Sequence, residues 1–170
     1  MTRRHATLPT ELGELLVVAD GDAMAGIYFP QHWHPPAEGS TGVRVESSTD
    51  PLFADLASQL TEFLDGRRRD FDLPIAPTGD PFQQAVWTRL REIPYGETTT
   101  YGALAVELGD RNLARRVGGA VGRNPLSIVV PCHRVVGATG ALTGYAGGLE
   151  RKLRLLELEG ASVVAQRRLF

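Results

Sequence analysis

Residues 98–125 read TTTYGALAVELGDRNLARRVGGAVGRNP, and this stretch decides the fold of the second half of the chain. A threonine cap precedes a helix expected over 101–108, and Gly109-Asp110 breaks that helix. A second helix fits 112–121 and ends at Gly122. A helix, a short turn containing glycine and a second helix predict a helix-turn-helix.

The second of these helices carries positive charge. Arg115 and Arg116 lie on it beside small residues such as Gly118, which allow a backbone to approach a groove closely. From Arg111 to Arg134 there are five arginines and no acidic residue, although the net charge of the 170-residue chain is −2. This local excess indicates a phosphate-binding surface, with a solvated helix face as the alternative.

The first half of the chain predicts a β-hairpin, one helix and a further strand. Apolar runs at 15–19 and 25–29 flank Asp20-Gly21-Asp22 and predict a β-hairpin. Apolar residues at helical spacing predict a helix over 51–64, and a strand is expected around 71–75.

A turn-rich segment at 77–81, PTGDP, is the expected domain boundary. We therefore expect an α+β protein with an N-terminal α/β domain, residues 1–79, and a mostly helical C-terminal domain, residues 80–170. Further helices are expected over 82–93 and 149–159, the latter ending at a glycine cap.

Composition favours an ordinary globular protein of the cytoplasm. Hydrophobic residues make up 42% of the chain and charged residues 22%. No apolar run approaches the roughly 18 residues that a membrane span needs, so no membrane partner is expected. The first 18 residues make a poor signal peptide, and a single cysteine suits a reducing compartment.

That cysteine, Cys132, is the candidate nucleophile. A buried lone cysteine is most often a small hydrophobic residue, but here His133 follows it and can accept the thiol proton directly or through water. An ordinary thiol is less than ~10% ionised near neutral pH, so such a base matters. A short buried strand expected over 128–130 would hold the nucleophile rigidly.

Glu159 is the candidate partner of that histidine. It lies at the edge of the apolar face of the last expected helix, and an acid at a helix C-terminus opposes the macrodipole unless a cation or histidine offsets it. Cysteine, histidine and glutamate together resemble a nucleophile, a base and an orienting group. A cysteine hydrolase could use the same set, but such an enzyme needs no groove-reading helix.

A family resemblance runs from Phe82 to Gly160. The run Pro131-Cys132-His133-Arg134-Val135 resembles the active-site signature of the O6-alkylguanine-DNA alkyltransferases. Further matching blocks are IPYGET at 93–98, ARRVGGA at 114–120, NP at 124–125, GYAGG at 144–148 and LELEG at 156–160. The first half resembles bacterial members more loosely, in GELLV at 13–17 and GIYFP at 26–30.

The resemblance implies a catalytic role for four residues. Cys132 would accept the alkyl group, and His133 would act as its base through a water. Glu159 would orient the histidine ring. Tyr101 would give a proton or a hydrogen bond to N3 of the departing guanine.

The resemblance also implies contacts to DNA and to the flipped base. Arg115 would enter the base stack where the flipped base was, and Asn124 would brace the second helix against the active site. The remaining DNA-binding residues would be Ala114, Arg116, Gly118 and Arg123. The remaining pocket residues would be Val135, Tyr145, Ala146 and Lys152, with the backbone N–H of residue 146 facing the guanine O6.

Fold and function follow from the same resemblance. It implies a first domain of ribonuclease H-like form and a single-turnover DNA-repair protein that binds double-stranded DNA containing O6-alkylguanine, with O4-alkylthymine as a further candidate substrate. No metal and no diffusible cofactor are expected, and His32 and His34 make only a weak metal site. The expected unit is a monomer, and clustering along DNA stays open.

The sequence departs from the family pattern at two positions. Position 146 often carries serine in relatives and is Ala146 here, and Ser127 stands where some relatives carry proline.

Two alternative functions remain open. The first is a non-catalytic sensor of DNA lesions or a helix-turn-helix regulator, and the second is a cysteine hydrolase. Stoichiometric alkyl uptake on Cys132 excludes the first, and multiple turnovers on an ester or amide would support the second.

Overall fold

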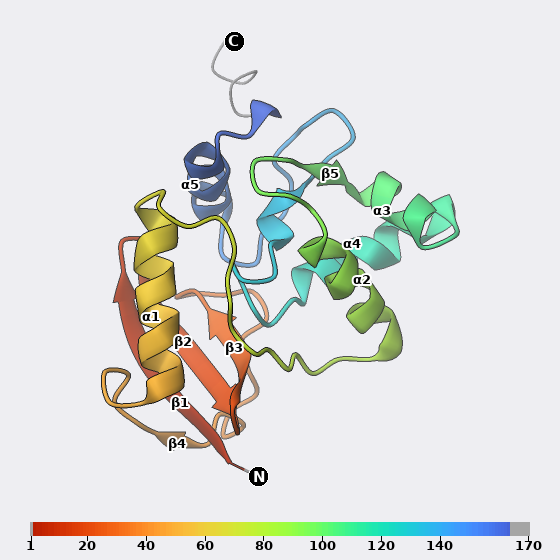
Figure 1. Cartoon of the computed structure of the whole chain (residues 1–170). Helices are drawn as coiled ribbons and strands as arrows, with labels where there is room; N and C mark the ends of the chain where they lie inside the picture. The colour runs from red at the N-terminus through yellow and green to blue at the C-terminus, as the bar shows by residue number, and fades with distance from the viewer. Residues whose placement is uncertain (1, 164–170) are drawn as a thin grey trace. The chain divides into compact units, whose positions relative to one another are not determined.

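The described part of the computed structural model, residues 2–163, divides into two units (Figure 1). Residues up to Thr78 and the segment Pro125–Val129 form the first unit. Gly79–Asn124 and the chain from Val130 onward form the second.

The first unit is built on a four-stranded sheet in the order β3-β2-β1-β4. The strands are β1 (Arg3–Thr10), β2 (Gly13–Asp20), β3 (Ala23–Tyr28) and β4 (Val43–Arg44). The pairs β1–β2 and β2–β3 are antiparallel, whereas β4 runs parallel to β1. The expected hairpin is confirmed as β2 and β3. The strand β1 was not anticipated, because its polar sequence RRHATLPT buries only Ala6 and Leu8.

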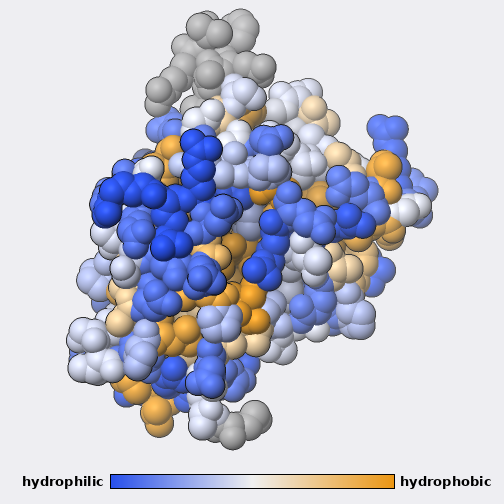
Figure 2. Space-filling model, viewed as in Figure 1, coloured by the Kyte–Doolittle hydropathy of each residue, from blue (hydrophilic) through white to orange (hydrophobic). Residues whose placement is uncertain are grey.

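Helix α1 (Pro51–Leu64) covers the sheet, as predicted from its apolar spacing (Figure 1). The side chain of Asp50 caps it by accepting hydrogen bonds from the amides of Leu52 and Phe53. Its inward face buries Phe53, Leu56, Leu60 and Phe63. The exposed residues of the helix include the polar Asp55, Ser58 and Thr61. In the view of Figure 2, most of the visible surface of the molecule is hydrophilic.

The strand expected around 71–75 does not form. Met24 makes an isolated bridge to Ile75, with hydrogen bonds from its amide to Pro74 O and from the Ala76 amide to its carbonyl, both 2.8 Å. A longer ladder would need an N–H from residue 74, and proline has none. The side chain of Gln59 instead takes up the backbone N–H and C=O of Asp72.

The prediction of a buried strand over 128–130 was also wrong. Ile128 has a φ of +73°, which breaks an extended strand, and the segment forms turns although it is buried. The carbonyl of Pro125 accepts from the Ile27 amide at 2.8 Å, and the Ser127 amide donates to Ile27 O at 3.3 Å. These bonds place Pro125–Val129 with the first unit, an association that local sequence patterns did not predict.

The second unit is mostly helical. Its elements are α2 (Pro81–Arg91), β5 (Thr99–Thr100), α3 (Tyr101–Glu107), the 3-10 turn η1 (Arg111–Leu113), α4 (Ala114–Gly122), the 3-10 turn η2 (Cys132–Arg134), β6 (Val135–Val136) and α5 (Leu149–Glu159). Strands β5 and β6 form a short parallel pair. The final helix ends as predicted at Gly160, which adopts the left-handed conformation with φ +69°.

The helix-turn-helix is confirmed as α3, η1 and α4. Thr100 caps α3 by accepting from the Ala103 amide at 3.0 Å. The second helix is preceded by the 3-10 turn η1, whose N-cap Asp110 accepts a hydrogen bond from the Asn112 amide at 2.9 Å. The indole N–H of Trp87 on α2 donates to Ala120 O at 2.8 Å and so fastens α4 to the neighbouring helix.

The cap of α1 can be tested with a pair of variants. Asp50→Ala removes both the cap and the ion pair with Arg4, and we expect it to lower the free energy of unfolding by about 2 kcal/mol. Asp50→Asn keeps a capping oxygen and loses the charge, so its loss should be about half as large. Urea unfolding measures both values, and equal losses would contradict a contribution from the cap.

Candidate active site

The thiol of Cys132 is buried at the start of η2, with 5% of the residue exposed. Its backbone N–H donates to Val130 O at 2.8 Å, which fixes the chain just before the sulfur. Burial raises the pKa of the Cys132 thiol, while Asn124, Lys152 and Tyr145 act in the opposite direction. The resting group is therefore a thiol, and a base is needed to make the nucleophilic thiolate.

His133 is wholly buried beside that thiol in sequence, and one of its ring nitrogens has no partner. Its Nε2 lies 2.8 Å from Oε2 of Glu159, whereas Nδ1 has no hydrogen-bond partner within the described residues. An ionised carboxylate only accepts hydrogen bonds, so Nε2 carries the ring proton and Nδ1 keeps its lone pair. Burial also lowers the pKa of His133, which favours this neutral form. The ring is thus set up to accept a proton at Nδ1.

Glu159 lies at the C-terminal end of α5 and is nearly fully buried. Burial by itself raises the pKa of its carboxyl, but hydrogen bonds from His133 and Arg134 outweigh burial and lower the pKa to about 2. The Gly96 amide also donates to Oε1 at 3.3 Å. The structure brings His133 and Glu159 together as the sequence predicted.

Arg134 is buried, whereas the basic segment predicted an exposed, phosphate-binding arginine. It counted among the five arginines of the basic segment, yet it is buried, with Nε and Nη2 each 2.9 Å from a carboxylate oxygen of Glu159. Its Nη1 donates to Ile93 O at 2.6 Å. The charge run could not show this, because an arginine is buried only where a partner distant in sequence comes close. The exposed arginines of the segment are Arg111, Arg115, Arg116 and Arg123.

Tyr101 is the first residue of α3, and its ring is half-buried. Its hydroxyl donates to Thr143 O at 3.4 Å. Burial raises the pKa of Tyr101, and negative charge on Cys132 raises it further. The phenol therefore stays protonated near neutral pH and lies within electrostatic reach of the nucleophile.

Lys152 on α5 is fully buried and holds the glycine-rich loop that spans 137–148. Its Nζ donates to Val135 O at 2.6 Å, Thr143 O at 2.8 Å and Gly144 O at 3.3 Å. Burial lowers the pKa of Lys152 to about 8. The ammonium ties the loop to β6, and the carbonyl of Thr143 accepts from both Lys152 and Tyr101.

The other pocket candidates are all buried in the second unit. They are Asn124, Val135, Tyr145 and Ala146. Asn124 directly follows the C-cap of α4, and its Nδ2 donates to Val130 O at 2.8 Å. This bond connects the end of α4 to the chain two residues before Cys132.

The candidate DNA-binding residues lie on or next to α4. Ala114 and Gly118 are partly exposed, and Arg123 is the exposed C-cap residue. Arg115 is exposed, and its side chain makes no hydrogen bond or ion pair with any residue in the range 2–163. The guanidinium of Arg116 lies 3.9 Å from the ring centroid of Phe82, in a cation–π contact. The two neighbouring arginines therefore differ in how freely they can reach a ligand.

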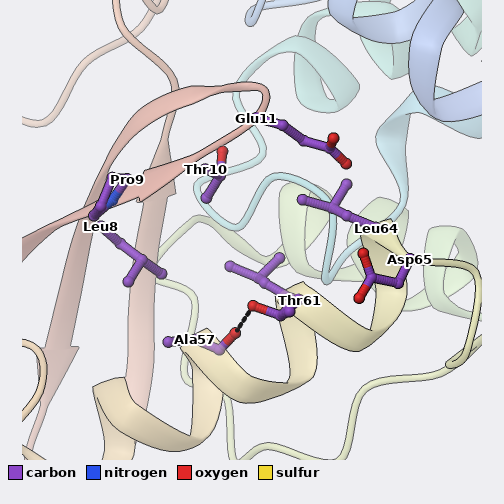
Figure 3. A pocket seen from close by; sticks show the side chains of 9 residues that line it. Leu8, Pro9, Thr10, Glu11, Ala57, Thr61, Leu64 and Asp65 are labelled. Atoms are coloured by element: carbon purple, nitrogen blue, oxygen red, sulfur yellow. Dashed lines mark hydrogen bonds between the residues drawn. The ribbon is translucent and has the colours of Figure 1, made fainter.

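The first unit contains a hollow of about 170 Å³ whose lining lacks the reactive groups found around Cys132. It lies between the end of β1 and α1, and Figure 3 shows Leu64 near the carboxylates of Glu11 and Asp65, with Leu8 at the other end of the hollow. Asp65 is already paired with Arg67 at 2.9 Å. The hollow contains neither a thiol nor an imidazole.

Metal ligands are sparse in the part of the chain that the structure describes. No group of three or more histidine, cysteine, aspartate or glutamate side chains is close enough there to hold an ion. The Nδ1 of His32 accepts from the Phe29 amide at 3.4 Å, which leaves the proton on Nε2 rather than a free lone pair. Burial lowers the pKa of His32 to about 4.

The helices of residues 2–163 include none that is long and apolar enough to cross a membrane.

Two family models together match most of the chain. Residues 81–161 match the DNA binding domain of 6-O-methylguanine DNA methyltransferase, and residues 4–77 match its ribonuclease-like domain. The chain belongs to the 6-O-methylguanine DNA methyltransferase family. This confirms the expected family, and the α+β fold with a ribonuclease-like first domain and a helical second domain is confirmed with it.

Relatives of this methyltransferase family match over nearly their whole length. A methylated-DNA–protein-cysteine methyltransferase of Methanosarcina acetivorans is 40% identical over 160 residues, 92% of this chain and 98% of the relative. One from Mycobacterium tuberculosis is 39% identical over 167 residues, 98% of each chain. The crystal structure of Mycobacterium tuberculosis OGT in complex with DNA superposes with a TM-score of 0.83 at 36% identity, covering 92% of both chains.

The Glu159 carboxylate should make stability depend on pH. Glu159→Gln leaves the Arg134 guanidinium buried without a carboxylate, so we expect the free energy of unfolding to fall by about 3 kcal/mol at neutral pH. The pKa of Glu159 is about 2 in the folded protein against an ordinary 4.5, so its stabilisation is complete above pH 4.5 and is lost as the pH falls towards 2. The two proteins should therefore converge in stability over that interval. Urea unfolding across a pH series measures the gap, and a gap that does not vary with pH would contradict the assignment.

Proposed function

We propose that this protein repairs alkylated DNA by moving the alkyl group from O6 of guanine to the sulfur of Cys132, once per molecule. The observation that carries the proposal is the buried Cys132 followed by His133, whose Nε2 is held by Glu159 and whose Nδ1 has no hydrogen-bond partner among residues 2–163. Family membership supports the reaction, since the relatives are named methylated-DNA–protein-cysteine methyltransferases.

The chemistry divides among the side chains of Cys132, His133 and Tyr101, with Glu159 holding the histidine ring. The thiol proton of Cys132 passes to Nδ1 of His133, directly or through one water, and the thiolate attacks the alkyl carbon in line. The bond from that carbon to O6 breaks as the bond to sulfur forms. If Tyr101 gives a proton to N3, guanine leaves as the neutral base and the His133 imidazolium returns a proton to the phenolate. If Tyr101 gives only a hydrogen bond, guanine leaves as an anion that then takes the proton from the His133 imidazolium. The thioether has no good leaving group, so the protein does not regenerate.

DNA is the proposed partner, and α4 the proposed reading element. Phosphate contacts from the exposed arginines give affinity with little sequence preference. The damaged nucleotide rotates out of the duplex at a cost of a few kcal/mol of unstacking, and Arg115 fills the gap. The solved complex of the Mycobacterium tuberculosis relative with DNA supports this partner.

Finer points of the proposal concern the assembly, the compartment and the substrate range. All the side chains invoked belong to one chain, so a monomer is the proposed acting unit, and clustering along DNA stays a prediction. A reducing cytoplasm is the proposed compartment because the reaction needs a free thiol. Repair of O4-alkylthymine stays a prediction. The departures at Ala146 and Ser127 concern the selectivity of the pocket, and the preferred size of the alkyl group stays open.

Alkyl uptake tests the function directly. After incubation with duplex DNA containing O6-methylguanine, the intact mass of the protein should rise by one methylene, mapped by peptide mass spectrometry to Cys132. Cys132→Ala should bind the same DNA with nearly unchanged affinity and gain no mass, because the thiol contacts no phosphate. Tight binding by the parent protein without mass gain would point to a lesion sensor, and repeated turnover on an ester would point to a hydrolase.

Variants of the two arginines at the start of α4 should behave differently in a second test. Successive helix residues point about 100° apart, so Arg115 and Arg116 cannot serve the same contact. Arg115→Ala should slow single-turnover repair of duplex DNA much more than repair of a single strand, which needs little unstacking. Arg116→Ala should weaken binding evenly across sequences and, if the side chain contacts phosphate, lower the salt slope by about 1. Equal slowing of both substrates by Arg115→Ala would show an ordinary phosphate contact.

A further inference from the structure

The carboxylate of Glu159 accepts two hydrogen bonds on each oxygen. Oε1 accepts from Nε of Arg134 at 2.9 Å and from the Gly96 amide at 3.3 Å. Oε2 accepts from Nη2 of Arg134 at 2.9 Å and lies 2.8 Å from Nε2 of His133. Of these three donor residues, Arg134 alone carries a permanent charge, and its two parallel bonds match the carboxylate. The ion pair is therefore complete without a proton on Nδ1 of His133.

This arrangement matters because a carboxylate beside an imidazole normally favours the imidazolium. An opposite charge within hydrogen-bond distance stabilises the charged form of a titratable group. An imidazolium carries a proton on each nitrogen and has no lone pair left. A Glu159 carboxylate without a counter-ion would therefore orient His133 and at the same time prevent it from acting as a base.

We infer that Arg134 is a positioning residue for the proposed alkyl transfer: its guanidinium neutralises Glu159, so that the carboxylate orients His133 while the ring stays neutral and open at Nδ1. The inference rests on the proposed function, since it concerns the base of that reaction. Arg134 acts through Glu159 and His133 and need not touch the DNA.

The groups that act on His133 come from two elements. From α5, Glu159 favours the imidazolium and Lys152 opposes it; from η2, Arg134 opposes it. Burial acts in the same direction as the two cations and is the largest effect, so the pKa of His133 is lowered overall. Cys132, also of η2, is the proton donor. Removal of Arg134 would leave Lys152 as the remaining cation of this set against Glu159.

The unmodified protein offers the first test. Ring resonances of ¹⁵N-labelled histidine, followed by NMR against pH, report the pKa and the tautomer of His133, and His133→Gln identifies its signals among the four histidines. We expect His133 to be neutral at pH 6.5, its ordinary pKa, with the proton on Nε2. Titration of His133 at or above that value would overturn the inference without any change to Arg134.

A pair of variants separates charge from shape. Arg134→Met removes the charge, so the pKa of His133 should rise and the acidic limb of the single-turnover methyl-transfer rate should move to higher pH. The neutral fraction at pH 6 falls about tenfold for each unit by which the raised pKa of His133 exceeds 6, so the rate should fall more near pH 6 than near pH 8. Arg134→Lys keeps the charge and loses the bidentate geometry, so its acidic limb should stay close to that of the parent. Equal losses at every pH, with the His133 pKa unmoved, would show that Arg134 only supports the fold.

A double variant restores the charge balance. Arg134→Met with Glu159→Gln removes both charges, and the pKa of His133 should return below 6.5 although the rate stays low for want of the orienting carboxylate. If Arg134→Met does not fold, Arg134→Lys and the titration of the unmodified protein still decide the matter. Failure of the proposed function looks different: the unmodified protein would gain no methyl group from DNA, while the titrations of His133 would still report the effect of Arg134.

Discussion

The buried carboxylate of Glu159 is the constraint on which the site depends. A charge that is removed from water costs several kcal/mol unless it is paired and hydrogen-bonded, and Glu159 satisfies this requirement with Arg134, His133 and the Gly96 amide. Meeting the requirement fixes two separate parts of the chain against the end of α5: the turn at 93–96 and the 3-10 turn η2, which carries the imidazole. The base is thereby oriented by an interaction that the fold needs in any case.

The nucleophile is held by a second set of contacts that leave it protonated until it is used. Burial keeps Cys132 as a thiol, which protects it from chance reactions, while His133 remains available to remove the proton. Lys152 donates to carbonyls of β6 and of the glycine-rich loop, and Tyr101 shares one of these carbonyls. Such prior ordering is what a protein that reacts only once requires, because geometry must be ready before the substrate arrives.

A hydrogen bond within the second unit connects the helix that carries the exposed arginines to the segment that leads into Cys132. Helix α4 carries the exposed arginines and ends just before Asn124, and the side chain of Asn124 holds Val130, two residues ahead of Cys132. Helix α4 and the nucleophile therefore belong to one packed structure, in which a hydrogen bond from Trp87 to Ala120 O also holds α4. A base that leaves the groove beside α4 would meet a nucleophile whose position is set by the same helix.

Local signals in the sequence determined most of the elements: the cap at Asp50 and the glycine at Gly160 mark helix ends correctly because capping involves only neighbours within a few residues. The Pro-Cys-His-Arg run and the helix-turn-helix likewise gave the family and the nucleophile, and Glu159 could be named as the partner of His133. The strands expected around 71–75 and 128–130 did not form, since apolar runs do not reveal the missing N–H of Pro74 or the positive φ of Ile128. The burial of Arg134 was decided only by the tertiary structure. Its partner lies 25 residues away, and whether an arginine faces solvent or a buried carboxylate depends on which segments pack together, which no local pattern of charge contains.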